Sequence, residues 1–283
     1  MYKIIEKKSL NSTVFKMVIE APMIARKAEP GQFIILRVDE SGERSPLTIA
    51  DFDREKGTVT IIVQIVGGTT EQLSHKKSGE YISDFTGPLG MPTHTEGLNK
   101  VAIVGGGVGC AIAYPIAKKL HEQGAVVHSI VGFRSKELVI LEEDFRNVSD
   151  ELYVVTDDGS YGSRGLVTDA LKNLIDSGEN YDTVIVIGPL IMMKFVAALT
   201  KPYAIKTIVS MNPIMIDGTG MCGGCRLTVG GETKFACVDG PDFDGHLVNF
   251  DEAIERSSMY KSFERKAHDE ACNLFRKEVH YYV

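Results

Sequence analysis

Three of the five cysteines in the chain lie in one short stretch, residues 216–240. They are Cys222, Cys225 and Cys237, in the spacing C-x2-C followed by C-x11-C. An odd number of clustered cysteines is typical of metal binding in a reducing compartment rather than of a disulfide framework. Three thiolates are one ligand short of a four-coordinate metal site. The stretch therefore predicts a metal centre that a fourth group completes.

The spacing indicates which residue that group is. Plant-type [2Fe-2S] clusters use the pattern C-x4-C-x2-C followed by a more distant cysteine. Four residues separate Asp217 from Cys222, so a carboxylate stands at the first position of this pattern. The surrounding glycines suit a loop that adopts unusual dihedral angles and aims N–H groups at sulfur. The sequence thus offers the ligand set Asp217, Cys222, Cys225 and Cys237.

Other assignments stay open at this point. Cys272, in the C-terminal tail, or a water molecule are alternative fourth ligands. Cys110 directly follows a glycine turn, and we expect it to pack at the start of a helix. Zinc also accepts three cysteines and an oxygen ligand, so a structural zinc site is the alternative to an iron–sulfur cluster.

A second candidate site is the glycine turn in "KVAIVGGGVGC", between a predicted strand and a predicted helix. Backbone N–H groups at such a turn can bind a pyrophosphate at the helix N-terminus. The candidate residues are Gly105, Gly106, Gly107, Val108 and Gly109. Because the dinucleotide fingerprint is incomplete, a turn that only packs tightly under the helix is the alternative interpretation.

The elements that must position these residues differ along the chain. Up to about residue 95, short stretches rich in Val, Ile and Phe, such as 13–21, 31–38 and 58–66, predict a small antiparallel β barrel. From Lys100 onward, strands alternate with helices, which predicts a parallel sheet covered on both faces. We expect four parts: residues 1–97, 98–210, a cluster segment at 211–250 and a helical tail at 251–283.

Composition excludes several classes of function. The formal net charge of −7 leaves no basic surplus for a nucleic-acid partner. There is no run of 18 apolar residues that predicts a membrane span, and the first residues resemble neither a signal peptide nor a transit peptide. These features predict a cytoplasmic protein. The sequence also contains no Ser-His-Asp or paired-carboxylate arrangement, so no acid–base catalytic residue is predicted.

A β barrel before a nucleotide-type sheet resembles the ferredoxin reductase superfamily, in which flavin binds the barrel and pyridine nucleotide binds the sheet. The segments "PGQFI", "ERSPLTI", "GGTTEQLS", "DFTGPLG", "VVTDDGSYGSRG" and "VIGPLIMM" carry this resemblance. Up to about Met259, the chain is similar to the electron transfer subunits of dihydroorotate dehydrogenase. "NPIMIDGTGMCGGCR" and "FACVDGPDFDGH" resemble more specifically the branch of small (alpha) subunits of NADH-dependent reduced ferredoxin:NADP+ oxidoreductases, also described as ferredoxin-NADP reductase subunit alpha or sulfide dehydrogenase subunit beta.

The resemblance implies an FAD site on the barrel. Its residues would be Arg44, Pro46, Leu47, Thr48, Gly67, Thr69 and Thr70. Arg44 would contact phosphate and Thr48 would lie beside the flavin ring. Arg44, however, precedes Thr48 by one residue more than the family's R-x-x-[ST] spacing.

The resemblance also implies an NAD(H) site on the sheet. Asp157 and Asp158 stand where relatives that bind a 2'-phosphate place Ser and Arg, and a carboxylate there would repel that phosphate. An acidic turn before Gly159 is the alternative interpretation. Gly188 and Pro189 resemble the loop beside the nicotinamide, although Ile187 replaces the usual cysteine.

In the family, the small subunit carries FAD, a [2Fe-2S] cluster and the NAD(H) site. A large subunit similar to the glutamate synthase small chain carries a second FAD, [4Fe-4S] clusters and the NADP(H) site, and ferredoxin reacts through it. Asp217, where dihydroorotate dehydrogenase subunits have Cys, favours the ferredoxin:NADP+ branch. Two alternatives are an electron transfer subunit of dihydroorotate dehydrogenase and a zinc-stabilised nucleotide-binding regulatory module. The tail is expected either to dock on the large subunit or to wrap the barrel.

Overall fold

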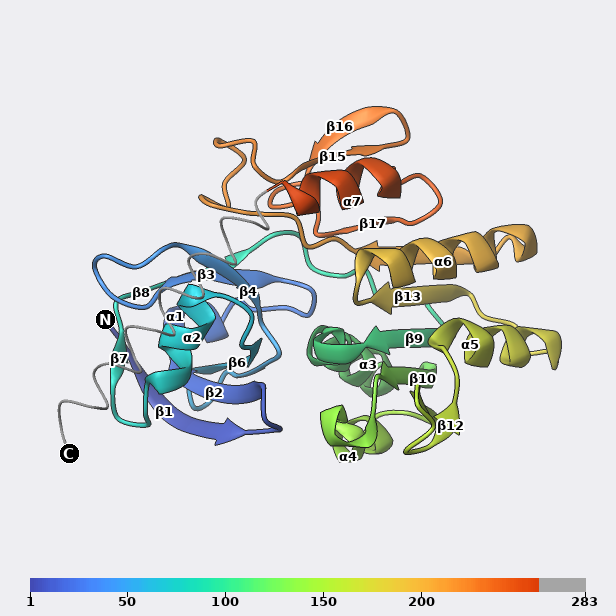
Figure 1. The fold of residues 1–283 in the computed structure, drawn as a ribbon, viewed down its shortest axis with the longest axis horizontal. Helices are drawn as coiled ribbons and strands as arrows, with labels where there is room; N and C mark the ends of the chain where they lie inside the picture. The colour runs from blue at the N-terminus through green and yellow to red at the C-terminus, as the bar shows by residue number, and fades with distance from the viewer. Residues whose placement is uncertain (260–283) are drawn as a thin grey trace.

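The computed structural model describes residues 1–259, which form a barrel, a nucleotide-type sheet and a third part that lies across both (Figure 1). Most of the predicted tail helix, residues 260–283 with Cys272, lies outside the described residues. Its beginning is helix α7 (Phe250–Ser258). Within residues 1–259, no helix combines the length and the apolar character needed to cross a membrane.

The barrel consists of two antiparallel sheets, as predicted. One has the strand order β5-β6-β2-β1-β7 and the other β4-β3-β8. The strands are β1 (Tyr2–Ser9), β2 (Val14–Glu20), β3 (Phe33–Arg37), β4 (Ser45–Thr48), β5 (Asp51–Asp53), β6 (Thr58–Gln64), β7 (Tyr81–Ile82) and β8 (Asp84–Leu89), with short helices α1 (Pro22–Ala25) and α2 (Gly68–His75). Side chains alternate between the two faces of β2, so Phe15, Met17 and Ile19 all point into the core, as expected for a sheet with one buried face.

The second sheet is parallel except at one edge, with the order β12-β11-β10-β9-β13-β14-β17. Its strands are β9 (Lys100–Gly106), β10 (Val126–Phe133), β11 (Glu151–Thr156), β12 (Ser163–Arg164), β13 (Thr183–Ile187), β14 (Lys206–Ser210) and the antiparallel β17 (Asp242–Asp244). Its helices are α3 (Cys110–Glu122), α4 (Glu142–Asn147), α5 (Val167–Asp176) and α6 (Leu190–Thr200).

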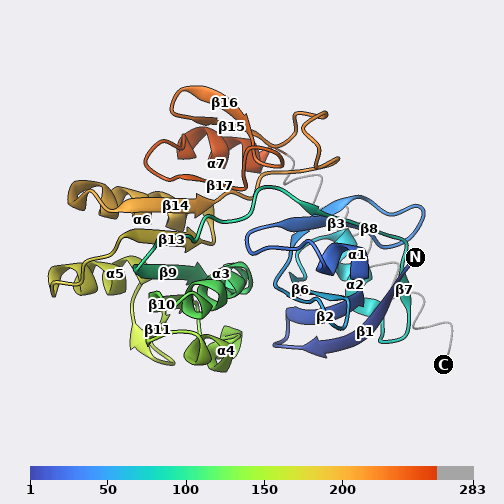
Figure 2. The ribbon, with the colours of Figure 1, turned by 180° about the vertical axis from the view of Figure 1, so that it is seen from behind.

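Helices cover both faces of this sheet. Val101 and Ile103 of β9 pack with α3 and α4, whereas Ala102 and Val104 pack with α5 and α6. The side of α3 that meets the sheet carries Ala113, Ile116, Ala117 and Leu120, at the i, i+3, i+4, i+7 spacing of an amphipathic helix. Cys110 is the first residue of α3 and is buried, as predicted. Figure 2 shows the same layers from behind.

The strand order contains a switch point. From β9 the chain adds β10, β11 and β12 on one side, and then resumes with β13 and β14 on the other. In open α/β sheets, ligands bind outside the carboxyl ends of the strands at such a point. The turn after β9 and the loop after β13 both lie there, because Ile187 pairs with Gly105.

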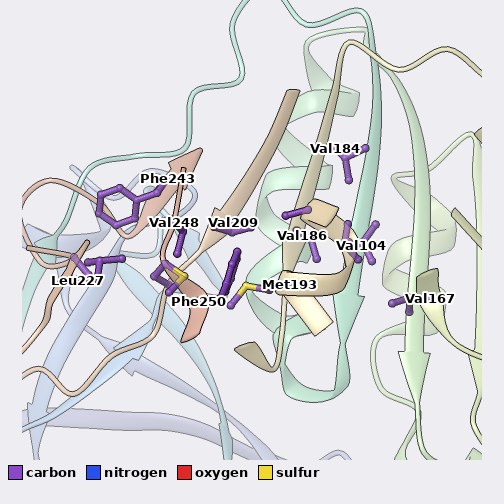
Figure 3. Close-up of a cluster of buried hydrophobic side chains, with 14 of the residues drawn as sticks. Val104, Val167, Val184, Val186, Met193, Val209, Leu227, Phe243, Val248 and Phe250 are labelled. Carbon is purple, nitrogen blue, oxygen red and sulfur yellow. The ribbon is translucent and has the colours of Figure 1, made fainter. Parts of the chain in front are cut away.

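The third part contains the hairpin β15 (Arg226–Val229) and β16 (Glu232–Phe235), strand β17 and helix α7. Its apolar side chains extend the core of the sheet: Figure 3 shows Phe243, Val248 and Phe250 beside Val209 of β14. The same buried cluster includes Phe33 of the barrel. One core therefore joins all three parts.

A partly buried polar contact lies at the same junction. Thr93, in the segment between barrel and sheet, donates from Oγ1 to Asp242 Oδ2 at 2.6 Å, and its backbone N–H donates to Pro30 O at 2.9 Å. The other oxygen, Oδ1, is buried and makes no hydrogen bond of normal geometry among the described residues, although the Ser210 hydroxyl is near enough to lower the pKa of the acid. Burial raises the pKa of Asp242 above its usual value. The folded protein thus binds a proton at Asp242 more readily than the unfolded chain does.

This raised pKa predicts how stability changes with pH. Because the folded state holds the proton more tightly than the unfolded chain, the contribution of Asp242 is fully present below the unfolded pKa of about 3.9 and is lost as pH rises through the folded value. Asp242→Asn keeps the acceptor for Thr93 and removes this loss. We expect its free energy of unfolding, from urea denaturation at a series of pH values, to increase relative to wild type as pH rises.

Asp244→Asn, in the same strand, is the control and should show no such trend. A constant difference between Asp242→Asn and wild type at every pH would contradict the interpretation.

Candidate functional site

The cluster loop, residues 211–225, follows β14 and crosses the barrel before hairpin strand β15 begins. Gly218 lies at the crossing with φ of +75°, and a Cβ atom there would be 2.7 Å from Ile35 Cδ1 and 2.8 Å from Leu89 Cδ1. Only glycine combines this left-handed backbone with such a close approach. The loop is thereby seated directly on β3 and β8.

Two of the predicted ligands form a buried pair. The Sγ atoms of Cys225 and Cys237 lie 3.2 Å apart, and both residues belong to the core that joins the three parts. Burial, together with the hydrogen bond from Cys225, raises the pKa of Cys237 to about 12. A metal at this pair must displace protons, because only thiolates are ligands.

The other two predicted ligands form a second pair near the surface. Asp217 Oδ2 accepts from the Cys222 N–H at 2.8 Å, and Oδ1 accepts from the Thr219 N–H at 2.9 Å. These backbone donors, Thr219 first, lower the pKa of Asp217, so its carboxylate is ionised as a metal ligand must be. Cys222 is exposed.

The arrangement is two pairs rather than one convergent quartet. Within residues 1–259, no three or more His, Cys, Asp or Glu side chains meet at one point where a single ion could bind. The negative charge of Asp217 nevertheless contributes to the raised pKa of Cys237, so the pairs are electrostatic neighbours. Two pairs match a two-iron cluster, in which each iron takes two protein ligands, better than a tetrahedral zinc ion.

The predicted flavin residues gather on one side of the barrel. Pro46, Leu47 and Thr48 lie in β4, where Thr48 pairs with Phe33 of β3. Gly67 immediately precedes α2, whose Thr69 Oγ1 contacts Glu43 Oε2 at 3.4 Å. The start of α2 therefore lies beside the segment that leads into β4.

The N-terminus of α2 offers backbone N–H groups to which an anion could bind. Thr70 Oγ1 accepts from the N–H groups of Val66 and Gly67 at 2.9 and 3.0 Å, which fixes the chain as it enters the helix. The N–H groups of the first helical turn have no partner inside the helix, and the positive end of the helix dipole is there. Such a terminus fits a flavin diphosphate.

Arg44 makes a different contact from the one that the resemblance implies. Its Nε donates to the carbonyl oxygen of Ile216 at 3.0 Å, in the cluster loop. The flavin-phosphate role of Arg44 stays a prediction, and the contact itself links the barrel to the residue before Asp217.

The glycine turn after β9 lies against the loop after β13. A Cβ atom on Gly106 would be 2.5 Å from Met192 Sδ and 3.2 Å from Pro189 Cδ, and one on Gly109 would be 2.5 Å from Ile187 O. The interpretation as a tightly packed turn is thus correct for these glycines. Gly107 has φ of +56° and open space on its Cβ side. The turn therefore packs at its base and stays open at its tip, where a pyrophosphate could approach.

The two acidic residues after β11 differ in what they do. Asp158 Oδ1 accepts from the Ser160 N–H at 2.9 Å, which supports the turn at Gly159, and the bonds from Ser160 lower the pKa of Asp158. The exposed side chain of Asp157 makes no hydrogen bond within residues 1–259. Within the described part of the chain, both oxygens of the Asp157 carboxylate are therefore free, whereas one oxygen of Asp158 is engaged in the turn.

A cavity of about 500 Å³ lies beside this turn, and sequence reasoning missed it. It is lined by Lys136, Val139, Leu141, Glu142, Glu143, Asp144 and Tyr161. The Lys136 N–H donates to Ser160 Oγ at 2.8 Å, which ties one wall to the turn, and Tyr161 donates to Glu142 Oε1 at 3.1 Å. The only sequence signal was the acidic run 142–144 shortly after a strand.

Comparison with known proteins agrees with this arrangement. Residues 212–249 match the model of the iron-sulfur cluster binding domain of dihydroorotate dehydrogenase B. A homologue of the electron transfer subunit of dihydroorotate dehydrogenase B (NAD(+)) from Thermotoga maritima is 45% identical over 94% of this chain and 94% of the relative. The electron transfer subunit itself from Bacillus cereus is 32% identical over 85% of this chain and 94% of its own length.

A solved structure of an NADH-dependent reduced ferredoxin-NADP oxidoreductase, described for flavin-based electron bifurcation, contains a chain with the same fold. The TM-score is 0.90 at 44% identity, covering 95% of this chain and 97% of that one. The predicted barrel-plus-sheet fold of ferredoxin reductase type is thereby confirmed. The chain belongs to the family of dihydroorotate dehydrogenase B electron transfer subunits and their homologues.

Proposed function

We propose that the chain is the flavin and iron–sulfur subunit of an NADH-dependent reduced ferredoxin:NADP+ oxidoreductase. It exchanges hydride with NAD(H) and passes single electrons to a larger subunit. The main observation behind the proposal is where the cluster loop packs on the barrel. Gly218 packs on Ile35 of β3, and β3 pairs with β4, the strand proposed to bind flavin. Flavin and cluster would therefore be neighbours on one small sheet.

The cofactors supply the electron chemistry, FAD exchanging hydride with NAD(H) and the [2Fe-2S] cluster carrying single electrons. The residues of the chain bind these cofactors and orient them relative to one another. Pro46, Leu47 and Thr48 of β4 would hold the flavin ring, and the N-terminus of α2 its diphosphate. The turn at 105–109 and the loop at Gly188 and Pro189 would hold the nucleotide at the switch point.

The preference for NAD(H) rests on negative charge. The free carboxylate of Asp157 would accept from ribose hydroxyls and repel a 2'-phosphate. The neighbouring cavity is lined by the carboxylates of Glu142, Glu143 and Asp144 and by Lys136, and Arg146 beside it pairs with Glu142 and Glu143. One negative charge therefore remains in excess there. We propose that this cavity receives the adenosine end of the dinucleotide.

Electron transfer subunits act within larger complexes, and we propose as partner a large subunit similar to the glutamate synthase small chain. It would carry a second FAD and [4Fe-4S] clusters, and ferredoxin would react through it. An apolar surface around the cluster loop supports a protein partner. Its residues are Ile214, Ile216, Met221 and Val238, whose exposed fractions are 39, 53, 88 and 41%. A cytoplasmic setting, where thiols stay reduced, suits this assembly.

The second candidate function is that of the dihydroorotate dehydrogenase partner, which the Bacillus cereus relative supports. The two functions differ in the catalytic chain that accepts electrons. The deciding experiment is anaerobic purification with assays of iron, sulfide and flavin, then mixing with each catalytic chain in turn. NADH-dependent reduction through the large subunit, and none with the dihydroorotate-oxidising chain, is expected. A colourless zinc protein would refute electron transfer altogether.

Asp217→Ala tests the fourth ligand. Removing the carboxylate leaves one iron with a single protein ligand, so we expect iron and sulfide to be lost while FAD stays near the wild-type ratio per chain. Asp217→Cys should retain the cluster, because a thiolate keeps the charge and the ligand position. Glu232→Gln, on the nearby hairpin, is the control and should change neither cofactor. Full iron content in Asp217→Ala would disprove the assignment.

Asp157→Ser tests nucleotide choice. Losing one exposed charge should reduce the NADH preference, the ratio of the two kcat/KM values, by about fivefold, since such charges contribute up to about 1 kcal/mol. Asp158→Asn keeps the acceptor for Ser160 and should reduce the ratio less than Asp157→Ser does, because that carboxylate is already engaged in the turn. An unchanged ratio in Asp157→Ser would exclude its role.

A further inference from the structure

Arg44 is an exposed residue of the barrel whose hydrogen bond reaches far along the sequence. Its Nε donates at 3.0 Å to the carbonyl oxygen of Ile216, 172 residues away. Ile216 is the residue immediately before Asp217. A side chain of the flavin domain thus contacts the main chain of the cluster loop.

The pairing of β4 relates Arg44 to this loop, because Pro46 pairs with Ile35 of β3, against whose side chain Gly218 packs. Arg44 directly precedes β4, where successive side chains point to opposite faces. If this alternation is extended by one residue, the side chain of Arg44 lies on the same face of the sheet as those of Pro46 and Thr48. The side chain of Ser45 lies on the opposite face, with that of Leu47. A guanidinium one position later would lie on the other face. The one-residue departure in spacing accordingly changes what the guanidinium contacts.

The chain is held on both sides of Asp217. On one side, Arg44 binds the carbonyl of residue 216. On the other, Gly218 lies so close to Ile35 and Leu89 that a Cβ atom would be under 3 Å from both side chains. Asp217 itself accepts from the N–H groups of Thr219 and Cys222. The position of its carboxylate relative to the barrel thus depends on contacts that the barrel provides.

We propose that Arg44 is a positioning residue for the metal centre: it fixes the main chain before Asp217 and so sets where this ligand stands relative to the flavin barrel. Arg44 acts through the loop and does not touch the iron. The inference rests on the proposed function, because it takes Asp217 as a ligand of a cluster beside a flavin.

Two variants of matched length isolate the hydrogen bond. In Arg44→Gln, the amide nitrogen stands the same number of bonds from Cα as the arginine Nε, so a donor remains while the positive charge is lost. In Arg44→Met, the side chain has similar length but no donor. Arg54→Met is the control, because Arg54 is an exposed barrel arginine that pairs with Glu29 away from the loop.

The experiment uses the anaerobically purified full chain. It measures FAD and iron per chain, the rate of iron loss to a chelator, and the EPR spectrum and midpoint potential of the reduced cluster. We expect Arg44→Met to keep FAD but lose iron about tenfold faster, the factor that corresponds to one hydrogen bond from a charged donor. Its EPR line shape and potential should also shift. Arg44→Gln should restore the wild-type values, and Arg54→Met should match wild type.

Two results would overturn the proposal. Loss of FAD from both Arg44 variants with an unchanged cluster would assign Arg44 to the flavin phosphate, which requires the charge that glutamine lacks. Wild-type iron loss, EPR spectrum and potential in Arg44→Met would leave the contact without a role. Absence of iron or flavin from the wild-type chain is a separate result, and it refutes the proposed function itself.

Discussion

The structure depends on one buried core that three parts of the chain share. Phe33 of the barrel, Val209 of the sheet and Cys225 of the third part belong to a single cluster of buried side chains. Flavin, nucleotide and cluster are each assigned to a different one of these parts, so the distances between them are set by how the parts pack. Truncating a large side chain at this junction would cost about 2 to 5 kcal/mol and would also loosen the relative placement of the three sites.

The glycine turn after β9 illustrates how packing and binding share one motif. Gly109 is required because the main chain at Ile187 and Gly188 leaves no room for a Cβ atom, whereas Gly106 packs against the side chains of Met192 in α6 and Pro189. This close packing brings the tip of the turn, at Gly107, to the edge where the two halves of the sheet diverge. Tight packing at the base therefore creates the open position at the tip, and the two interpretations of the motif are compatible.

Local patterns in the sequence were sufficient to predict much of this fold. Short stretches rich in Val, Ile and Phe predicted the barrel strands, and the change to strands alternating with helices predicted the parallel sheet. The C-x4-C-x2-C spacing pointed to Asp217 because the first three ligands lie within one loop. In contrast, the contact of Arg44 with Ile216 and that of Thr93 with Asp242 join residues more than 140 positions apart. Neither contact has a local signature, since each exists only because the parts pack together. The acidic cavity was missed for the same reason, because Tyr161 and residues 136–144 follow different strands.

The two ligand pairs also differ in how accessible they are. Cys225 and Cys237 are part of the shared core, whereas Cys222 is at the surface. In the folded chain, the thiols of Cys225 and Cys237, the inner pair, are inaccessible to an iron donor. Only Asp217 and Cys222, the outer pair, can be reached from solvent. Under the proposed ligand assignment, iron could reach the inner pair only before residues 225–237 pack or while they open, so assembly of the metal centre would be coupled to folding of this segment.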